Sequence, residues 1–89
     1  MRRHVRIEGA VQGVGFRWWA VQRAGEFRLR GTVRNLPDGA VDVHVEGNGD
    51  DIDRFMTALS RGPRSARVDH IRELEAGNEP LPDNFEVRY

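Results

Sequence analysis

Residues 11–17, with the sequence VQGVGFR, form the part of this 89-residue chain whose residue types and spacing are best suited to chemistry. Two glycines separated by one residue let successive backbone N–H groups point into one concavity without a Cβ in the way. An arginine follows two residues later, and its planar fork of donors matches the oxygens of a phosphate. The segment is therefore a candidate anion-binding turn. From the spacing alone, a tight turn with an ordinary surface arginine remains the alternative.

Other phosphate-binding and metal-binding motifs are not indicated. Trp18 stands where a dinucleotide-binding loop has its third glycine, and no Gly-Lys-Ser/Thr follows, so a nucleotide is not expected. The chain has no cysteine, and its three histidines are scattered at His4, His44 and His70. We therefore expect no metal site and no cofactor. His44 is interpreted as a solvated strand residue rather than a ligand.

The candidate turn lies between a predicted strand and a predicted helix. Residues 3–9 place Val5, Ile7 and Gly9 on one face, which is the period of two typical of a half-buried strand. A helix is predicted from about 16 to 27, with its apolar side formed by Phe16, Trp19, Ala20, Ala24 and Phe27. The turn would thus lie at a helix N-terminus, whose first four N–H groups are unpaired.

The rest of the chain continues this alternation. Residues 30–35 and 40–46 form a hairpin around Leu36-Pro37-Asp38-Gly39, and the valines of the second strand face inward. A second helix follows Gly49, with Asp50 or Asp51 as its cap, and ends before Gly62-Pro63. Its apolar stripe is Ile52, Phe55, Met56 and Leu59. Residues 66–75 form a strand whose apolar phase slips between Val68 and Ile71, which indicates a bulge, and residues 85–89 form a last short strand.

This order, β-α-β-β-α-β with a short terminal strand, predicts an α+β fold. The simplest arrangement is a ferredoxin-like sandwich with one antiparallel sheet and both helices on one face. Eighty-nine residues suffice for a single core, so we expect one domain over residues 1–89. Because many unrelated activities share this fold, the fold alone indicates no chemistry.

The charge of the chain is zero overall but uneven along its length. Residues 1–35 contain eight arginines against two acids, whereas residues 36–89 contain six arginines against twelve acids. Either the first third attracts an anion, or the two parts neutralise each other across the sheet. No apolar run is long enough for a membrane span, and the N-terminus lacks the apolar region of a secretory signal. We expect a soluble, cytoplasmic protein without a membrane partner.

Three blocks of this sequence resemble the acylphosphatase family, in order and over nearly the whole chain. They are EGAVQGVGFR at 8–17, GTVRNLPDG at 31–39 and GPRSARV at 62–68. The resemblance implies the sandwich fold and the hydrolysis of the carboxyl–phosphate bond of small acyl phosphates, without a metal or cofactor. It also implies that the phosphoryl group is bound by Arg17 and by the N–H groups of Gln12, Gly13, Val14, Gly15, Phe16 and Arg17. Asn35 would position the attacking water, and inorganic phosphate or sulfate would bind as a product-like ligand.

Two positions depart from the family pattern. Thr32 stands where the family usually has tryptophan, which affects only the packing of a sheet face. Arg28 stands where a glycine usually ends the first helix, so we expect either a positive φ at Arg28 or a shorter helix. Asn35 lies beside the turn if its strand and the first strand pair centrally. Trp18 lies off the apolar side of its helix and either borders the site or leans on the surface.

Three alternatives remain open. RNA-recognition modules share the topology, but the outward positions of the central strands carry no aromatic residue on which a base would stack, so we expect no nucleic-acid partner. A domain that binds an anion without turnover would keep the same turn. The chain is also similar to the acylphosphatase-like module at the front of larger carbamoyl-transfer maturation factors. We expect a monomer, because nothing in the sequence suggests an obligate partner.

Overall fold

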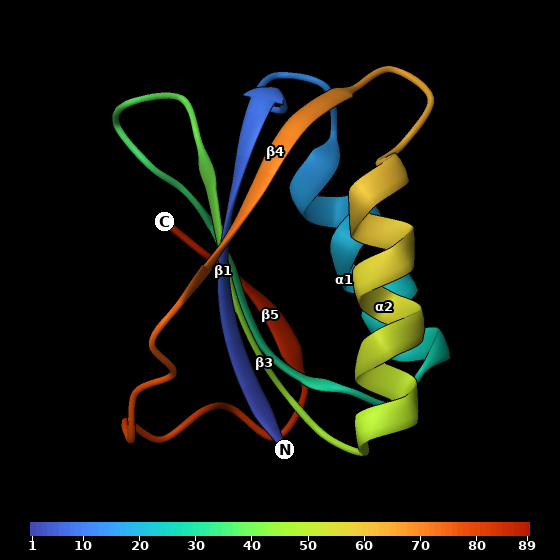
Figure 1. Ribbon diagram of the computed structural model, residues 1–89, viewed down its shortest axis with the longest axis vertical. Coiled ribbons are helices and arrows are strands. Elements are labelled where there is room, and N and C mark those ends of the chain that lie inside the picture. The colour runs from blue at the N-terminus through green and yellow to red at the C-terminus, as the bar shows by residue number, and fades with distance from the viewer.

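The computed structural model describes residues 1–89 and shows two helices packed on one face of a five-stranded sheet (Figure 1). The elements, in chain order, are β1 (Arg2–Ala10), α1 (Phe16–Glu26), β2 (Arg30–Asn35), β3 (Val41–Glu46), α2 (Gly49–Arg61), β4 (Arg67–Leu74) and β5 (Phe85–Arg88). The predicted ferredoxin-like sandwich is thus confirmed. Neither helix is long and apolar enough to cross a membrane.

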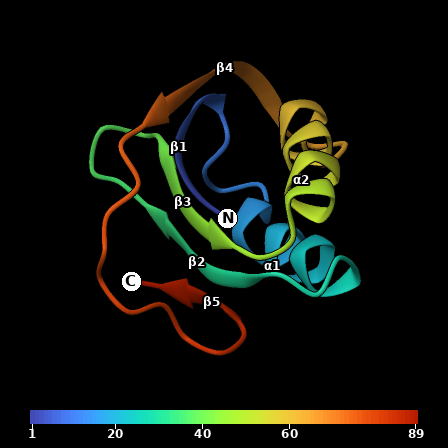
Figure 2. The same ribbon diagram turned by 60° about the horizontal axis from the view of Figure 1, so that its bottom comes forward.

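The sheet has the strand order β4-β1-β3-β2-β5. All neighbouring strands are antiparallel except β2 and β5, which are parallel, so the prediction of a wholly antiparallel sheet is wrong. The reason lies in the chain direction: β4 runs opposite to β2, and the segment after β4 reverses the chain before β5. That segment runs along the side of the sheet that faces away from the helices (Figure 2).

One hydrophobic core fills the space between the sheet and the helices, and it consists of 15 buried residues. Alternation along the strands directs Val5, Val33 and Val43 toward it, and these three lie opposite one another across β1, β3 and β2. The helices contribute Phe16, Ala20, Ala24, Ile52, Phe55 and Leu59. Trp19 is half-buried against Phe16, as the helical periodicity predicts.

The C-terminus of α1 adopts the strained geometry that the sequence predicts. The helix ends at Glu26, and Arg28 has a φ of 56°, a left-handed conformation that costs an L-residue roughly 1–2 kcal/mol. The N–H groups of Phe27 and Leu29 both bond to the carbonyl of Ala24, which closes the turn. Of the two expected consequences of the missing glycine, the positive φ at Arg28 is the one observed.

Two other local predictions have different outcomes. The bulge is confirmed: Glu8 pairs with His70 but Gly9 pairs with Val68, which leaves Asp69 as the extra residue of β4. The predicted cap of α2 is wrong. Asn48 is the N-cap, and its Oδ1 accepts from the N–H of Asp50 at 2.9 Å. Both aspartates lie inside the first turn, where their charge still favours the helix N-terminus.

We predict that Gly25→Ala stabilises the protein by about 0.5–1 kcal/mol, because Gly25 is exposed within α1 and an added Cβ meets nothing within 4 Å. The matched control is Gly15→Ala, which also has open space around the added Cβ but has a φ of 78°. It should destabilise by about 1–2 kcal/mol. Urea unfolding of both variants measures the difference, and equal effects would contradict the conformational argument.

Candidate active site

The turn between β1 and α1 contains two glycines in the left-handed region. Gly13 has a φ of 76° and Gly15 a φ of 78°, and Gly15 is the N-cap of α1. A Cβ at either position meets nothing within 4 Å, so the backbone conformation, and not a lack of space, makes glycine suitable here. Alternation of left-handed and other residues is the geometry that turns successive N–H groups to one side.

The backbone N–H groups of residues 12–18 donate to no acceptor in the protein. The first helical hydrogen bond of this segment runs from the N–H of Trp19 to the carbonyl of Gly15, at 3.1 Å. The amides of Gln12 to Arg17 are therefore free to bind a ligand or water. Because they lie at a helix N-terminus, the helix dipole adds partial positive charge at the same place.

A small cavity of about 80 Å³ opens at this turn and brings several predicted site residues together. Its lining is Val11, Gly13, Gly15, Phe16, Arg17, Trp18 and Asn35. Gln12 and Val14, which were predicted as donors, do not line it, although their amides are also unpaired. Trp18 is 62% exposed and borders the cavity, which decides between the two roles expected for it.

The guanidinium of Arg17 forms no ion pair or hydrogen bond with the protein, unlike most arginines of the first third of the chain. Its central carbon lies 5.0 Å from the centroid of the Tyr89 ring. This cation–π contact uses none of the N–H donors of Arg17, so they remain available to an anion. This contact could not be predicted from the sequence, because Tyr89 lies at the other end of the chain.

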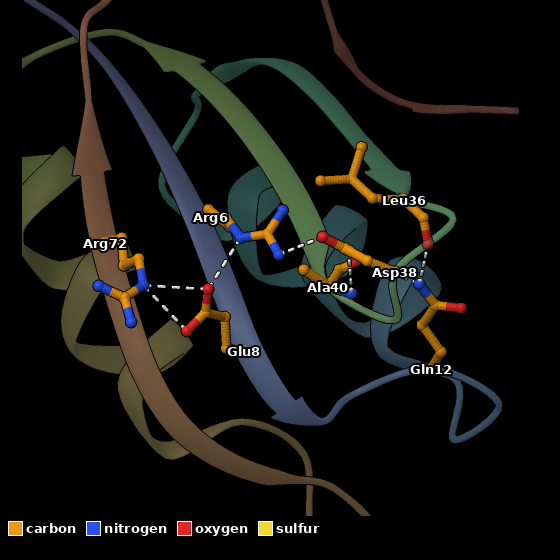
Figure 3. Close-up of polar contacts among 7 residues, drawn as sticks. All are labelled: Arg6, Glu8, Gln12, Leu36, Asp38, Ala40 and Arg72. Atoms are coloured by element: carbon orange, nitrogen blue, oxygen red, sulfur yellow. Dashed lines mark hydrogen bonds and ion pairs between the residues drawn. The ribbon is translucent and has the colours of Figure 1, made fainter.

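Asn35 ends β2 and faces the same cavity, but not through direct pairing of β1 and β2. The two strands do not pair, since β3 lies between them, yet Asn35 still lines the cavity at the turn. The connection is made by the Gln12 side chain instead. Its Nε2 donates to the carbonyls of Leu36 and Ala40, both at 2.8 Å, which ties the turn to the β2–β3 hairpin (Figure 3).

A second contact holds the turn from the opposite side. Ser65, in the connection between α2 and β4, donates its Oγ–H to the carbonyl of Val14 at 2.9 Å. Ser65 belongs to the third sequence block, at 62–68, in which the sequence analysis predicted no functional residue. The contact from Ser65 uses a backbone carbonyl of the turn, and the contact from Gln12 uses its side-chain amide. Both contacts therefore fix the shape of the turn and leave its backbone N–H groups free.

Acidic side chains near the turn are paired with arginines (Figure 3). Arg6 donates to Glu8 at 2.8 Å and also to Asp38, and Arg72 donates to Glu8 at 3.0 Å. Hydrogen bonds from Arg6, and then from Arg72, hold the pKa of Glu8 below its usual value. The bond from Arg6 likewise lowers the pKa of Asp38. Both carboxylates are thus ionised and paired near neutral pH.

The uneven charge of the chain is largely neutralised across the sheet. Arg2 pairs with Glu46 and Arg3 with Glu73, so arginines of the first third meet acids of the remainder. Arg6 and Arg30 follow the same pattern with Asp38 and Glu46. Of the two explanations left open by the sequence, neutralisation holds for these arginines, whereas Arg17 at the turn remains unpaired.

The histidines are not all scattered in space. His4 and His44 are partners across β1 and β3, and their rings stack with centroids 3.8 Å apart. The His44 side chain points away from the helices as predicted, but it is only 19% exposed, so the description of it as solvated is wrong. Burial, followed by the charge of His4, lowers the pKa of His44.

The fold is an α+β sandwich, and the connection between its first strand and first helix presents unpaired backbone N–H groups beside Arg17. The model of the family described as Acylphosphatase matches residues 3–87. An acylphosphatase from Nitratidesulfovibrio vulgaris is 43% identical over 90 residues, which covers 99% of this chain and 90% of the relative. The crystal structure of acylphosphatase from Bacillus subtilis superposes with a TM-score of 0.90 at 29% identity, covering 99% of this chain and 98% of that one. The crystal structure of T. kodakarensis HypF has a TM-score of 0.87 at 35% identity, and this chain covers 12% of it.

This chain belongs to the acylphosphatase family. Its activity is that of an acylphosphatase, a hydrolase that acts on acyl phosphates. The resemblance noted from the three sequence blocks is thereby confirmed, and the fold of the structural relatives agrees with the observed sandwich.

We predict that Gln12→Ala lowers kcat/KM by about 10- to 100-fold, because the hairpin that carries Asn35 is no longer held against the turn. The backbone N–H of residue 12 is unchanged in this variant, so the effect reports on the side chain alone. The loss of two hydrogen bonds should also lower the free energy of unfolding by about 1–3 kcal/mol. Gln22→Ala, at an exposed position of α1, is the control. Unchanged kcat/KM in Gln12→Ala would contradict the positioning role.

Proposed function

We propose that the amides of Gln12 to Arg17 and the guanidinium of Arg17 bind the phosphoryl group of the substrate, while Asn35 orients the attacking water. One observation supports this assignment above all: the amides have no acceptor within the protein, and Gly13, Gly15, Phe16, Arg17 and Asn35 line one cavity. Inorganic phosphate, the product, and sulfate, which has the same tetrahedral shape, would bind in the same place.

The proposed reaction is an in-line displacement at phosphorus. The water oxygen forms a bond to phosphorus as the bond from phosphorus to the acyl oxygen breaks, and the acyl group leaves as a carboxylate. Phosphoryl transfer passes through a loose transition state, so positioning and charge stabilisation supply most of the catalysis. The backbone donors and Arg17 are placed to stabilise the charge on the equatorial phosphoryl oxygens.

Neither a general acid nor a metal is required by this chemistry. The conjugate acid of the leaving carboxylate has a pKa of about 4, so the group departs as an anion without receiving a proton. The proton of the attacking water passes to a phosphoryl oxygen of the substrate itself. Arg17 and the helix N-terminus provide the positive charge that a bound cation supplies in other phosphoryl-transfer enzymes.

The size of the cavity restricts recognition to the reacting groups. The cavity has a volume of about 80 Å³, which is small enough that only the phosphoryl group and the atoms next to it would be enclosed. The acyl portion would extend past the exposed ring of Trp18 toward solvent. We therefore propose small acyl phosphates as substrates, distinguished only weakly by their acyl chains.

Four further expectations stay predictions. They are a single domain over residues 1–89, a monomeric state, a cytoplasmic location and the absence of a nucleic-acid partner. The alternative of an anion-binding domain without turnover differs from the proposal in one measurable respect, because it binds inorganic phosphate but releases none from an acyl phosphate.

We predict that Arg17→Ala lowers kcat/KM for a model acyl phosphate by roughly 30- to 5,000-fold, which corresponds to the 2–5 kcal/mol typical of removing one partner of a close charge pair. The assay measures phosphate release in the presence of EDTA, in which the wild-type protein should remain fully active. Arg23→Ala, on the same helix but paired with Glu26, is the matched control. Full activity in Arg17→Ala, or activity of the wild type only with added metal, would refute the assignment.

Asn35→Ala should affect the chemical step rather than binding. We predict a decrease in kcat of about 10²–10³-fold, because a preorganised polar group is lost, with little change in the affinity for inorganic phosphate. Steady-state kinetics and an NMR titration with phosphate separate the two effects. Asn78→Ala, in an exposed loop, controls for the loss of an amide elsewhere. Weaker phosphate binding at normal kcat would instead place Asn35 among the binding groups.

A further inference from the structure

A cluster of two histidines and one aspartate lies on the face of the sheet opposite the helices. His4 comes from β1, while Asp42 and His44 come from β3, two residues apart and therefore on one face. The segment after β4 runs along this face of the sheet (Figure 2), and Arg2 anchors that segment through the carbonyls of Gly77 at 3.0 Å and Glu79 at 2.7 Å. The phosphate-binding cavity contains none of these residues.

Both imidazole rings direct Nε2 at the same carboxylate. Nε2 of His4 lies 2.5 Å from Oδ1 of Asp42, and Nε2 of His44 lies 3.3 Å from Oδ2. The side chains of His4, Asp42 and His44 are only 18%, 11% and 19% exposed, respectively. One ligand atom from each residue lies within 4.8 Å of the others. Two imidazole nitrogens and a carboxylate oxygen form a donor set that suits divalent transition metals.

We infer that this cluster is a binding site for a divalent transition-metal ion such as Zn²⁺, held by Nε2 of His4, Nε2 of His44 and the carboxylate of Asp42. Zinc–nitrogen bonds of about 2.0–2.1 Å in tetrahedral geometry place ligand atoms about 3.4 Å apart. The present spacing is within about 1–1.5 Å of that arrangement. Three protein ligands leave a fourth position for water.

The surroundings of His4 match those of a metal-bound histidine. Its Nδ1 lies 3.3 Å from the carbonyl oxygen of Glu75. When Nδ1–H donates to that carbonyl, the lone pair of the neutral ring is at Nε2 and faces the ion. A backbone acceptor of this kind fixes both the tautomer and the ring orientation of a ligand.

Binding requires the two rings to separate. They are almost parallel, at 16°, and a nitrogen lone pair lies in the plane of its ring, so the stacked rings must splay to direct both lone pairs at one ion. A cavity of about 380 Å³ adjoins His44 and Asp42 and gives His44 room to rotate. The same cavity is also lined by Arg34, Arg88 and Glu79. Because these side chains carry charges of both signs, they do not by themselves attract a cation. Affinity must therefore come from the direct ligands.

The test is a titration of the metal-free full chain with Zn²⁺ by calorimetry, and with Co²⁺ by visible absorption. We expect one ion per chain and the intense visible bands of low-coordinate Co²⁺, which Zn²⁺ should displace. His44→Ala and Asp42→Asn should each lower the affinity at least about 100-fold, because either removes a direct ligand and loss of a mere supporting contact already costs 10- to 100-fold. His70→Ala, an exposed histidine of β4, is the matched control and should bind as the wild type does.

A thermal melt provides the second readout, because an ion that binds only the folded state raises Tm. Zn²⁺ should raise the Tm of the wild type and of His70→Ala but not that of His44→Ala, with circular dichroism confirming that each variant is folded. If Asp42→Asn does not fold, the results for His44→Ala alone decide the test. No saturable binding by the wild type, wild-type affinity in His44→Ala, or loss of binding in His70→Ala would each overturn the inference. None of these measurements depends on hydrolase activity.

Discussion

Six consecutive backbone amides without a protein acceptor, those of residues 12–17, are the feature on which the rest of the site depends. A buried amide without a partner is costly, so such a turn must lie at the surface, where water pairs with its donors until a ligand replaces it. The turn must nevertheless keep one shape. It does so through groups other than these amides: the carbonyl of Val14 accepts from Ser65, and the side chain of Gln12 reaches the hairpin. The contacts that support the turn and the proposed binding of a ligand thus use different atoms of residues 12–17.

The strand topology explains why Asn35 comes close to that turn. β1 and β2 are both antiparallel to β3, so they are parallel to each other, and their carboxyl ends lie at the same edge of the sheet. The turn leaves the end of β1 and Asn35 closes β2, with one strand between them. Gln12 spans that strand by bonding to Leu36 and Ala40 at the start and end of the hairpin turn. The fold brings the two parts of the site to one edge, and a single side chain sets their relative position.

Local periodicity was sufficient to predict most of this fold, and the spacing of glycines and arginine at residues 13–17 indicated the turn at which a cavity opens. The alternation of valines, the Leu-Pro-Asp-Gly turn and the Gly-Val-Gly spacing each act over a few residues, and each led to the right element. What the sequence did not reveal depends on contacts between distant segments. The contact of Tyr89 with Arg17 needs the path of β5, and the stacking of His4 on His44 needs the register of β1 against β3. The cap at Asn48 was missed for a different reason, since Asn48, Asp50 and Asp51 lie within four residues and all three are good cap residues.

The zero net charge of the chain is compatible with binding a dianion because compensation is local. Exposed ion pairs such as that between Arg3 and Glu73 add little stability. Each pair nevertheless neutralises the charge of one carboxylate, which then repels a distant anion less. Near the turn, Glu8 and Asp38 are both occupied by arginines, and the lowered pKa of each keeps these pairs intact as the pH falls toward their usual titration range. Arg17 has no such partner, and its guanidinium contacts the ring of Tyr89. Arg17 and the N-terminus of α1 therefore both contribute uncompensated positive charge beside the cavity, which is the charge that the proposed binding of a phosphoryl group requires.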